Sequence, residues 1–139
     1  DEFHPGGAWL ANTHQGHFPI EDKGDDGYKG VAPVARFPVE GYGLYDMSGN
    51  VWEWCADWYD RELYRRRAGK EVIVSPSGPE LPRDPRRPFT PQRVQKGGSF
   101  LCHDSYCTRY RPSARHGCSP DTGMSHVGFR CVKSADWKE

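Results

Sequence analysis

Two cysteines five positions apart are the residues of this sequence best suited to chemistry. Cys102 and Cys107 enclose the segment His-Asp-Ser-Tyr. On a straight strand an odd separation sends two side chains to opposite faces, and on a helix five steps leave them about 140° apart. Both sulfurs can therefore meet one atom only if residues 103–106 turn, which the His-Asp-Ser composition permits.

Two thiolates without a third and fourth cysteine nearby suit a soft, low-coordinate ion such as Cu(I) better than tetrahedral zinc. The spacing alone leaves two alternatives open. One is a disulfide or a pair of inert buried thiols, and the other is a metal-binding or redox-active pair. Because the chain has five cysteines, at least one thiol is free for chemistry or for a partner outside the chain.

Two acidic loops that contain glycine, residues 22–27 and 46–53, could bind a hard cation. Calcium takes about 6 to 8 oxygen ligands from carboxylates and backbone carbonyls. Neither loop has the spacing of an EF-hand, so a plain turn and a calcium site are equal alternatives at this point. The histidines show no HxxxH or HExxH spacing, and we expect them at the surface or in hydrogen bonds. GxSxG, P-loop and GxGxxG motifs are absent.

Short strands and loops must position these residues, because the chain contains 16 glycines and 12 prolines. Residues 51–58 fit both a strand and a helix, and the aromatic enrichment after a Ser-Gly-Asn turn favours a strand. Residues 94–102 and 127–132 also predict strands, and residues 60–68 predict a helix. In residues 75–92 every third residue is proline, which predicts a stiff polyproline II surface loop or a docking ligand for another domain.

Composition and charge limit the possible classes of protein. The 139 residues allow one domain or part of one, and 19 basic residues balance 19 acidic residues. This balance gives no field that would attract nucleic acid or an anionic membrane. The chain has no apolar run long enough to span a membrane and no signal-peptide pattern. We expect a soluble chain, cytoplasmic if bacterial, and its first residue, Asp, suggests a fragment or a processed product.

Four motifs of the chain resemble those of the formylglycine-generating enzymes, also called sulfatase-modifying factors. They are GYGLYDMSGNVWEW at 41–54, KGGSFLCH at 96–103, SYCTRYR at 105–111 and VGFRC at 127–131. The GNVWEW and GFR segments also occur in the wider superfamily. The cysteine pair is the feature that indicates the oxidase.

This resemblance implies an α+β fold of the C-type-lectin-like kind, with little regular secondary structure and with short antiparallel strands between loops. Residues 1–139 would form the C-terminal part of a single domain, whose N-terminal half is absent from this chain and is an expected partner. The implied reaction is the oxidation by O2 of a cysteine in a Cys-x-Pro/Ala-x-Arg motif of an unfolded sulfatase polypeptide to Cα-formylglycine.

The resemblance also implies roles for individual residues. Cu(I) would lie between Cys102 and Cys107, and a substrate thiolate would complete the site. The remaining candidates line the pocket of the family, with catalytic positions at Ser99 and Trp52 and substrate-binding positions at Tyr106, Arg109 and His126. The best-studied members carry Asn at the position of His126, and Cys131 matches a cysteine that in some members forms a disulfide with the absent half.

Two calcium sites of the family map onto the two acidic loops and the segment before the first. One set comprises Asn12, Thr13, Asp26 and Tyr28, and the other comprises Asp46, Gly49, Val51 and Glu53. Backbone carbonyls would be the ligands at Thr13, Tyr28, Gly49 and Val51. The resemblance therefore favours calcium over a plain turn.

Two other classes of protein share parts of this pattern. A catalytically silent paralogue would be a calcium-stabilised, lectin-like binding module, and such paralogues usually lack the cysteine pair. An iron sulfoxide synthase needs a three-histidine facial site, and no such histidine cluster is visible in the sequence.

Overall fold

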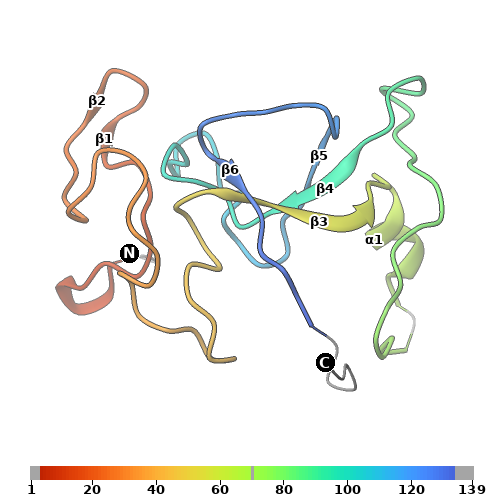
Figure 1. The fold of residues 1–139 in the computed structure, drawn as a ribbon, viewed down its shortest axis with the longest axis horizontal. Coiled ribbons are helices and arrows are strands. Elements are labelled where there is room, and N and C mark those ends of the chain that lie inside the picture. Colours follow the sequence, from red (N-terminus) through yellow and green to blue (C-terminus); the bar gives the residue numbers. More distant parts are fainter. Residues whose placement is uncertain (1–3, 70, 134–139) are drawn as a thin grey trace.

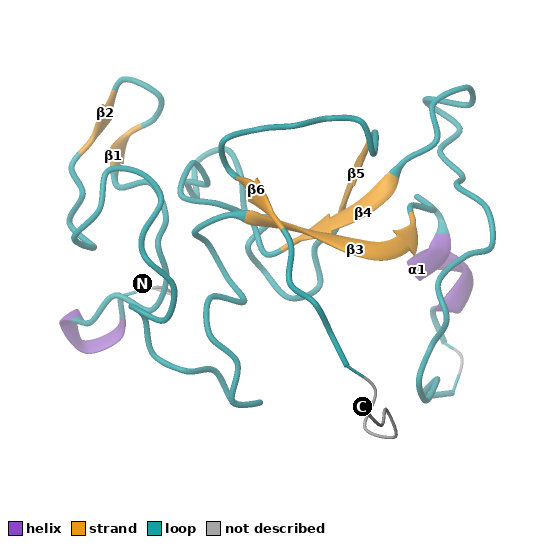
Figure 2. Ribbon diagram, viewed as in Figure 1, coloured by secondary structure: helices purple, strands orange, loops and turns teal. Residues whose placement is uncertain are grey.

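The computed structural model describes residues 4–69 and 71–133, and most of this chain is loop (Figure 2). A sheet of 4 strands with the order β5-β4-β3-β6 crosses the middle of the molecule (Figure 1). Its strands are β3 (Trp52–Trp58), β4 (Arg93–Lys96), β5 (His116–Cys118) and β6 (Val127–Gly128). The expectation of a loop-rich mixed fold is confirmed.

The pairing of the strands is antiparallel for β3 with β4 and for β4 with β5. The pair β3 and β6 is parallel, with Trp52 opposite Val127 and Glu53 opposite Gly128, so the expected antiparallel pattern does not extend to this edge. This register joins the GNVWEW motif directly to the GFR motif. The two motifs that also occur in the wider superfamily are therefore neighbours in one sheet.

Smaller elements lie on both sides of the sheet. The hairpin of β1 (Gly16–His17) and β2 (Glu21–Asp22) and the 3-10 turn Pro5–Gly7 lie on one side, and α1 (Leu63–Arg67) lies on the other (Figure 1). None of the helices in the described ranges, 4–69 and 71–133, has the length and apolar character needed to span a membrane.

The prediction of a strand over residues 94–102 is wrong beyond Lys96, where β4 ends. Gly97 and Gly98 follow with φ angles of 90° and 74°, which are left-handed values that strands do not adopt. A Cβ atom on Gly98 would lie 2.9 Å from Cα of Tyr110. The double glycine therefore turns the chain and lets it approach Tyr110 closely.

Two other predicted elements are shorter than expected. The predicted strand 127–132 ends at Gly128, and beyond it Arg130 contacts β3 through its side chain, which donates to the Glu53 carboxylate. The predicted helix 60–68 is reduced to α1. Asp60 precedes the helix and is only 2% exposed, and its carboxylate accepts a hydrogen bond from the backbone N–H of Glu62 at 2.9 Å.

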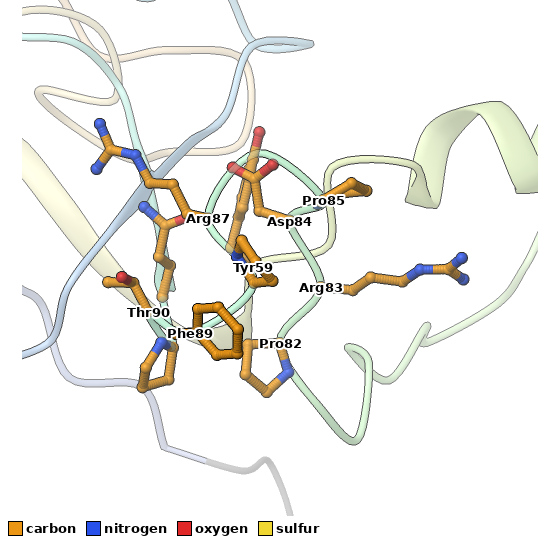
Figure 3. A pocket seen from close by; sticks show the side chains of 11 residues that line it. Tyr59, Pro82, Arg83, Asp84, Pro85, Arg87, Phe89 and Thr90 are labelled. Carbon is orange, nitrogen blue, oxygen red and sulfur yellow. The ribbon is translucent and has the colours of Figure 1, made fainter.

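The proline-spaced segment 75–92 lies mostly at the surface, as predicted. Its backbone is tied to the chain around Tyr59 by three hydrogen bonds. The N–H of Arg83 donates to the carbonyl of Tyr59 at 2.8 Å, the N–H of Arg61 donates to the carbonyl of Arg83 at 2.9 Å, and the N–H of Tyr59 donates to the carbonyl of Gln92 at 2.8 Å. Tyr59 and residues between Pro82 and Gln92 of this segment line a shallow cavity of about 360 Å³ (Figure 3). Phe89, one of these residues, is 95% exposed. The cysteine pair does not contribute to this cavity.

Gly49 and Asn50 connect four segments of the chain. The N–H of Gly49 donates to the carbonyl of Gly97, and the N–H and C=O of Asn50 bond to Asn12 and Phe100, at 2.8 to 2.9 Å. The Asn50 side chain accepts from the N–H of Ala32 at 2.9 Å and from the Asn12 amide at 3.1 Å. Asn50 also has a φ of 58°, a conformation that Asn tolerates better than most residues.

Asn50→Ala is expected to lower the free energy of unfolding by about 2 to 4 kcal/mol, because it leaves the buried polar groups of Ala32 and Asn12 without their partner. Chemical denaturation followed by tryptophan fluorescence measures the change. Glu80→Ala, at an exposed position of the proline-spaced segment, should change the free energy by less than about 0.5 kcal/mol. Equal effects of the two substitutions would contradict the central role of Asn50.

Candidate two-thiol site

A tight turn brings the two predicted thiols together. The backbone N–H groups of Tyr106 and Cys107 both donate to the carbonyl of His103, at 3.0 and 2.7 Å. The sulfur atoms of Cys102 and Cys107 lie 2.8 Å apart, and both residues are free thiols. The turn over residues 103–106 that a shared site requires is therefore present.

The two sulfurs differ in protonation. The hydrogen bond from the Cys102 thiol, assisted by the backbone N–H and the charge of Arg109, lowers the pKa of Cys107 to about 6. The same hydrogen bond and burial raise the pKa of Cys102, and hydrogen bonds from Ser99 oppose this only in part. Near neutral pH the pair therefore consists of a Cys107 thiolate that accepts a hydrogen bond from a Cys102 thiol.

The environment of the pair is apolar and largely closed to water. Cys102 and Cys107 are 2% and 7% exposed and pack with Trp52, Tyr110 and Val127 in one hydrophobic cluster. Burial of this kind strengthens electrostatic interactions at the sulfurs, because the local dielectric constant is low. The charge on a sulfur of this pair therefore interacts more strongly with its neighbours than the charge on a surface thiolate does.

A cavity of about 300 Å³ opens next to the sulfurs. All of the residues predicted for catalysis or substrate binding line it, namely Trp52, Ser99, Cys102, Tyr106, Cys107, Arg109 and His126. Tyr106 is 60% exposed and stacks on Phe18 with ring centroids 4.2 Å apart. The structure thus gathers these residues from three separate segments, at 52, 99–109 and 126, around one space.

Four further residues line the same cavity and were missed by the sequence analysis: Gln95, Leu101, His116 and Met124. Gln95 of β4 lies opposite Trp54 of β3 and His116 of β5. Because paired residues share a face of a sheet, this register places all three on one face, which is also that of Trp52. The strand over residues 116–118 has no recognisable period, so only the tertiary structure reveals this group.

His116 is neutral in this environment. Burial, together with the charges of Arg109 and Arg87, lowers the pKa of its imidazole. The Arg109 guanidinium lies 3.3 Å from Nδ1 of His116. Since a guanidinium can only donate, Nδ1 is the acceptor and the proton of the ring is on Nε2.

The first set of predicted calcium ligands is brought together around Asp26. The Asp26 carboxylate accepts hydrogen bonds from the backbone N–H groups of Thr13, at 3.1 Å, and Tyr28, at 2.9 Å. Asn12 is 1% exposed, and within the described chain its Oδ1 atom has no hydrogen-bond partner. A carboxylate and a buried, unpaired amide oxygen are the type of donor that calcium prefers. The side-chain amide of Gln15 donates to the same carboxylate at 2.9 Å and to the carbonyl of Thr13, so it would have to move to admit an ion.

The second set is engaged in other interactions. The Arg130 guanidinium donates to the Glu53 carboxylate, with Nε 2.6 Å from Oε2, and to the carbonyls of Tyr45 and Asp46 at 3.1 and 3.3 Å. The Asp46 carboxylate accepts from the N–H of Ala35 at 2.8 Å. The Arg130 guanidinium therefore already compensates the charge of Glu53, one of the four predicted ligands of this set.

Among residues 4–69 and 71–133, no group of three or more His, Cys, Asp or Glu side chains is arranged to hold a metal ion. The three-histidine site that an iron sulfoxide synthase would need is therefore not formed by the part of the chain that the structure describes. The two-thiol pair has only two such side chains and is therefore not a group of this kind.

Comparison of the sequence with known protein families identifies the family to which this fold belongs. Residues 1–135 match the sulfatase-modifying factor enzyme 1-like domain. The chain belongs to this family.

Individual relatives show how far the likeness extends. The formylglycine-generating enzyme of Thermomonospora curvata is 48% identical over 133 residues, which are 95% of this chain and 41% of that protein. The inactive C-alpha-formylglycine-generating enzyme 2 of Mus musculus is 36% identical over 127 residues, 89% of this chain and 33% of that protein. The chain thus spans about two fifths or less of the length of these relatives.

A solved structure supports the fold assignment alone. PvdO from Pseudomonas aeruginosa superimposes with a TM-score of 0.57 at 24% identity, covering 86% of this chain and 37% of that chain. The arrangement of loops and short strands is therefore shared with a protein of low sequence identity.

The thiolate of Cys107 should be detectable by its ultraviolet absorbance. In the metal-free, reduced chain, absorbance is expected to rise with pH in a step centred at about 6, which is below the usual range of a free cysteine. Cys107→Ser should remove this step, and Cys102→Ala should move it to higher pH by removing the hydrogen-bond donor. Cys118→Ser should leave the step unchanged, and a step that persists in Cys107→Ser would assign the thiolate to another residue.

Proposed function

We propose that this chain carries the two-thiol centre of a copper-dependent oxidase that converts a substrate cysteine to Cα-formylglycine. The observation that supports this most strongly is the contact of two buried thiols, 2.8 Å apart, beside a cavity that all the predicted pocket residues line. The higher identity to the active relative than to the inactive one points in the same direction.

The residues present fit Cu(I), because two adjacent, buried sulfurs are soft ligands. When bound, copper(I) would supply one-electron chemistry toward dioxygen. Cys107, already a thiolate near neutral pH, would bind first, and Cys102 would release its proton as it becomes the second ligand. Trp52 and Val127 would exclude water, which would protect a reactive site from side reactions.

The overall reaction balances with dioxygen and an external thiol reductant. The thiol-bearing methylene group of the substrate cysteine loses two electrons and two protons, water adds to the resulting carbon, and sulfur leaves as hydrogen sulfide to give the aldehyde. Dioxygen accepts these two electrons and two more from a pair of reductant thiols, and it ends as water. The substrate class is the cysteine of a Cys-x-Pro/Ala-x-Arg segment in an unfolded sulfatase.

The remainder of such an enzyme lies outside this chain, because the chain corresponds to about 41% of the Thermomonospora relative. We expect that additional part to complete the substrate groove. Cys131 is exposed and unpaired in the structure, which leaves it available for the proposed disulfide with such a segment.

The rival function is a catalytically silent binding module. The presence of both cysteines favours the oxidase, since a binding module has no use for a buried pair of thiols that share a proton. The two functions differ in one direct observation, which is the affinity of the chain for Cu(I).

Cys102→Ser or Cys107→Ser is expected to reduce Cu(I) affinity by at least about 100-fold, because a hard hydroxyl replaces a soft thiolate of similar size. Competitive titration against a chelator of known affinity measures this in the isolated chain. A peptide containing Cys-x-Pro-x-Arg, incubated with O2 and a thiol reductant, provides the test of turnover by mass spectrometry.

Matched controls come from the other free cysteines. Cys55→Ser and Cys118→Ser should retain Cu(I) affinity within a few-fold, since both are only partly buried and lie outside the cavity. If Cys118→Ser is as damaging as Cys107→Ser, the proposed ligands are wrong. If the unaltered chain has no measurable affinity for Cu(I), the binding-module function is favoured instead.

We also propose that calcium binds the first ligand set and stabilises the fold by mass action. Binding at 100 times the dissociation constant would add about 2.7 kcal/mol to the free energy of unfolding. Thermal unfolding of the unaltered chain should therefore shift upward when calcium is added after treatment with chelator. The unpaired Oδ1 of Asn12 and the Asp26 carboxylate support this proposal.

Neighbouring aspartates give a controlled test of the calcium site. Asp26→Asn should abolish the calcium-dependent shift of the unfolding temperature, whereas Asp25→Asn, at an exposed position, should preserve it. Glu53→Gln should also preserve it, because Glu53 is paired with Arg130. A calcium response lost in Glu53→Gln but kept in Asp26→Asn would assign the ion to the second set.

A further inference from the structure

Gln95 is a buried polar residue without a structural partner for its amide nitrogen. Its side chain is 1% exposed, and within the part of the chain that the structure describes, Nε2 donates no hydrogen bond. Buried polar groups are nearly always hydrogen-bonded. An exception that lies beside a candidate active site indicates a ligand that supplies the partner.

The position of Gln95 directs it toward the two-thiol site. It lies in β4 between β3 and β5, on the face of the sheet that carries Trp52, and it lines the cavity that contains both sulfurs. Gln92 also is buried, but it donates to the carbonyl of Gly117 at 3.0 Å and lines the cavity of the proline-spaced segment instead. Gln95, within β4, and Gln92, directly before it, therefore have different surroundings.

Two of the residues that line the cavity with Gln95 present hydrogen-bond donors. His116, opposite Gln95 in β5, has its proton on Nε2, and Arg109 can only donate. The complementary group is an oxygen acceptor rather than a donor. In a cavity of about 300 Å³ that also contains the thiols, the acceptor must be part of the ligand that approaches the sulfurs.

We propose that Gln95, together with His116, binds a backbone carbonyl oxygen next to the substrate cysteine and so positions that cysteine at the two thiols. This proposal rests on the proposed function, because it takes the substrate to be a cysteine-containing peptide. A peptide carbonyl is a strong acceptor that every substrate sequence offers. Gln95 and His116 thus contribute to peptide positioning independently of the side chains around the cysteine.

The test uses the metal-free, reduced chain and a peptide containing Cys-x-Pro-x-Arg, with binding followed by NMR chemical shifts. The side-chain amide signal of Gln95 should move on titration with the peptide. Gln95→Leu, which is close in size and apolar, should weaken peptide binding by about tenfold, the loss typical of one buried hydrogen bond. His116→Phe should weaken it by a comparable factor.

Two readouts separate positioning from a structural role. Gln95→Leu should leave the unfolding temperature unchanged or raise it, since it removes an unpaired polar group, and it should leave Cu(I) affinity unchanged. Gln92→Leu should lower the unfolding temperature by removing the bond to Gly117 and should leave peptide binding unchanged. A lower unfolding temperature in Gln95→Leu would show that its amide is structural and would overturn the proposal.

A modified peptide identifies the acceptor. Replacing the carbonyl oxygen on either side of the substrate cysteine by sulfur gives two thioamide peptides, and sulfur is the weaker acceptor. One of them should bind the unaltered chain more weakly than the parent peptide does. This loss should be smaller in Gln95→Leu, in which only His116 still donates to that atom. Equal binding of all three peptides to the unaltered chain would overturn the proposal while leaving the copper site intact, whereas absence of any peptide binding would overturn the proposed function as well.

Discussion

The hydrogen bonds of Gly49 and Asn50 are the constraint on which the rest of the structure depends. A chain in which only 35% of the residues are hydrophobic cannot rely on a large apolar core. Buried polar groups at Asn50 instead join the segments around Asn12, Ala32 and Phe100. Each of these bonds has a modest net value, but an unmet buried partner is costly. The network therefore acts as a unit, and it fixes the start of β3.

From this point the site is assembled over a short distance. The N–H of Phe100 bonds to Asn50, and the next turn holds the N–H of Cys102 on the carbonyl of Ser99 at 2.9 Å. In β3, Trp52 packs against the two cysteines, and the neighbouring Glu53 pairs with Arg130 of the GFR segment. The GNVWEW motif, the segment around the cysteine pair and the GFR motif are thus in direct contact. Displacing one of them would disturb both the sheet and the lining of the cavity.

The sequence predicts part of this arrangement, and physical reasons explain the remainder. Residues 51–58 have a local period and a turn before them, and their strand is present as Trp52–Trp58. The thiol pair follows from the need for a turn between two cysteines. Gln95 and His116 meet only through a register between two strands, and a register depends on long-range pairing that local patterns do not contain. The Arg130 pair with Glu53 spans 77 positions and has no local signal either.

The two sulfurs differ in the contacts that hold them and in the cavities that they line. The backbone of Cys102 is held on both sides. Its N–H donates to the carbonyl of Ser99, a residue that is 0% exposed, and its carbonyl accepts from the N–H of His14 at 3.0 Å. Cys107 follows the exposed Tyr106 and precedes exposed residues 108 and 109. Cys102 nevertheless lines a second cavity, of about 590 Å³, together with His14 and His103, so the pair lies between two cavities. The thiolate of Cys107 lines the smaller of these two, beside the exposed Tyr106.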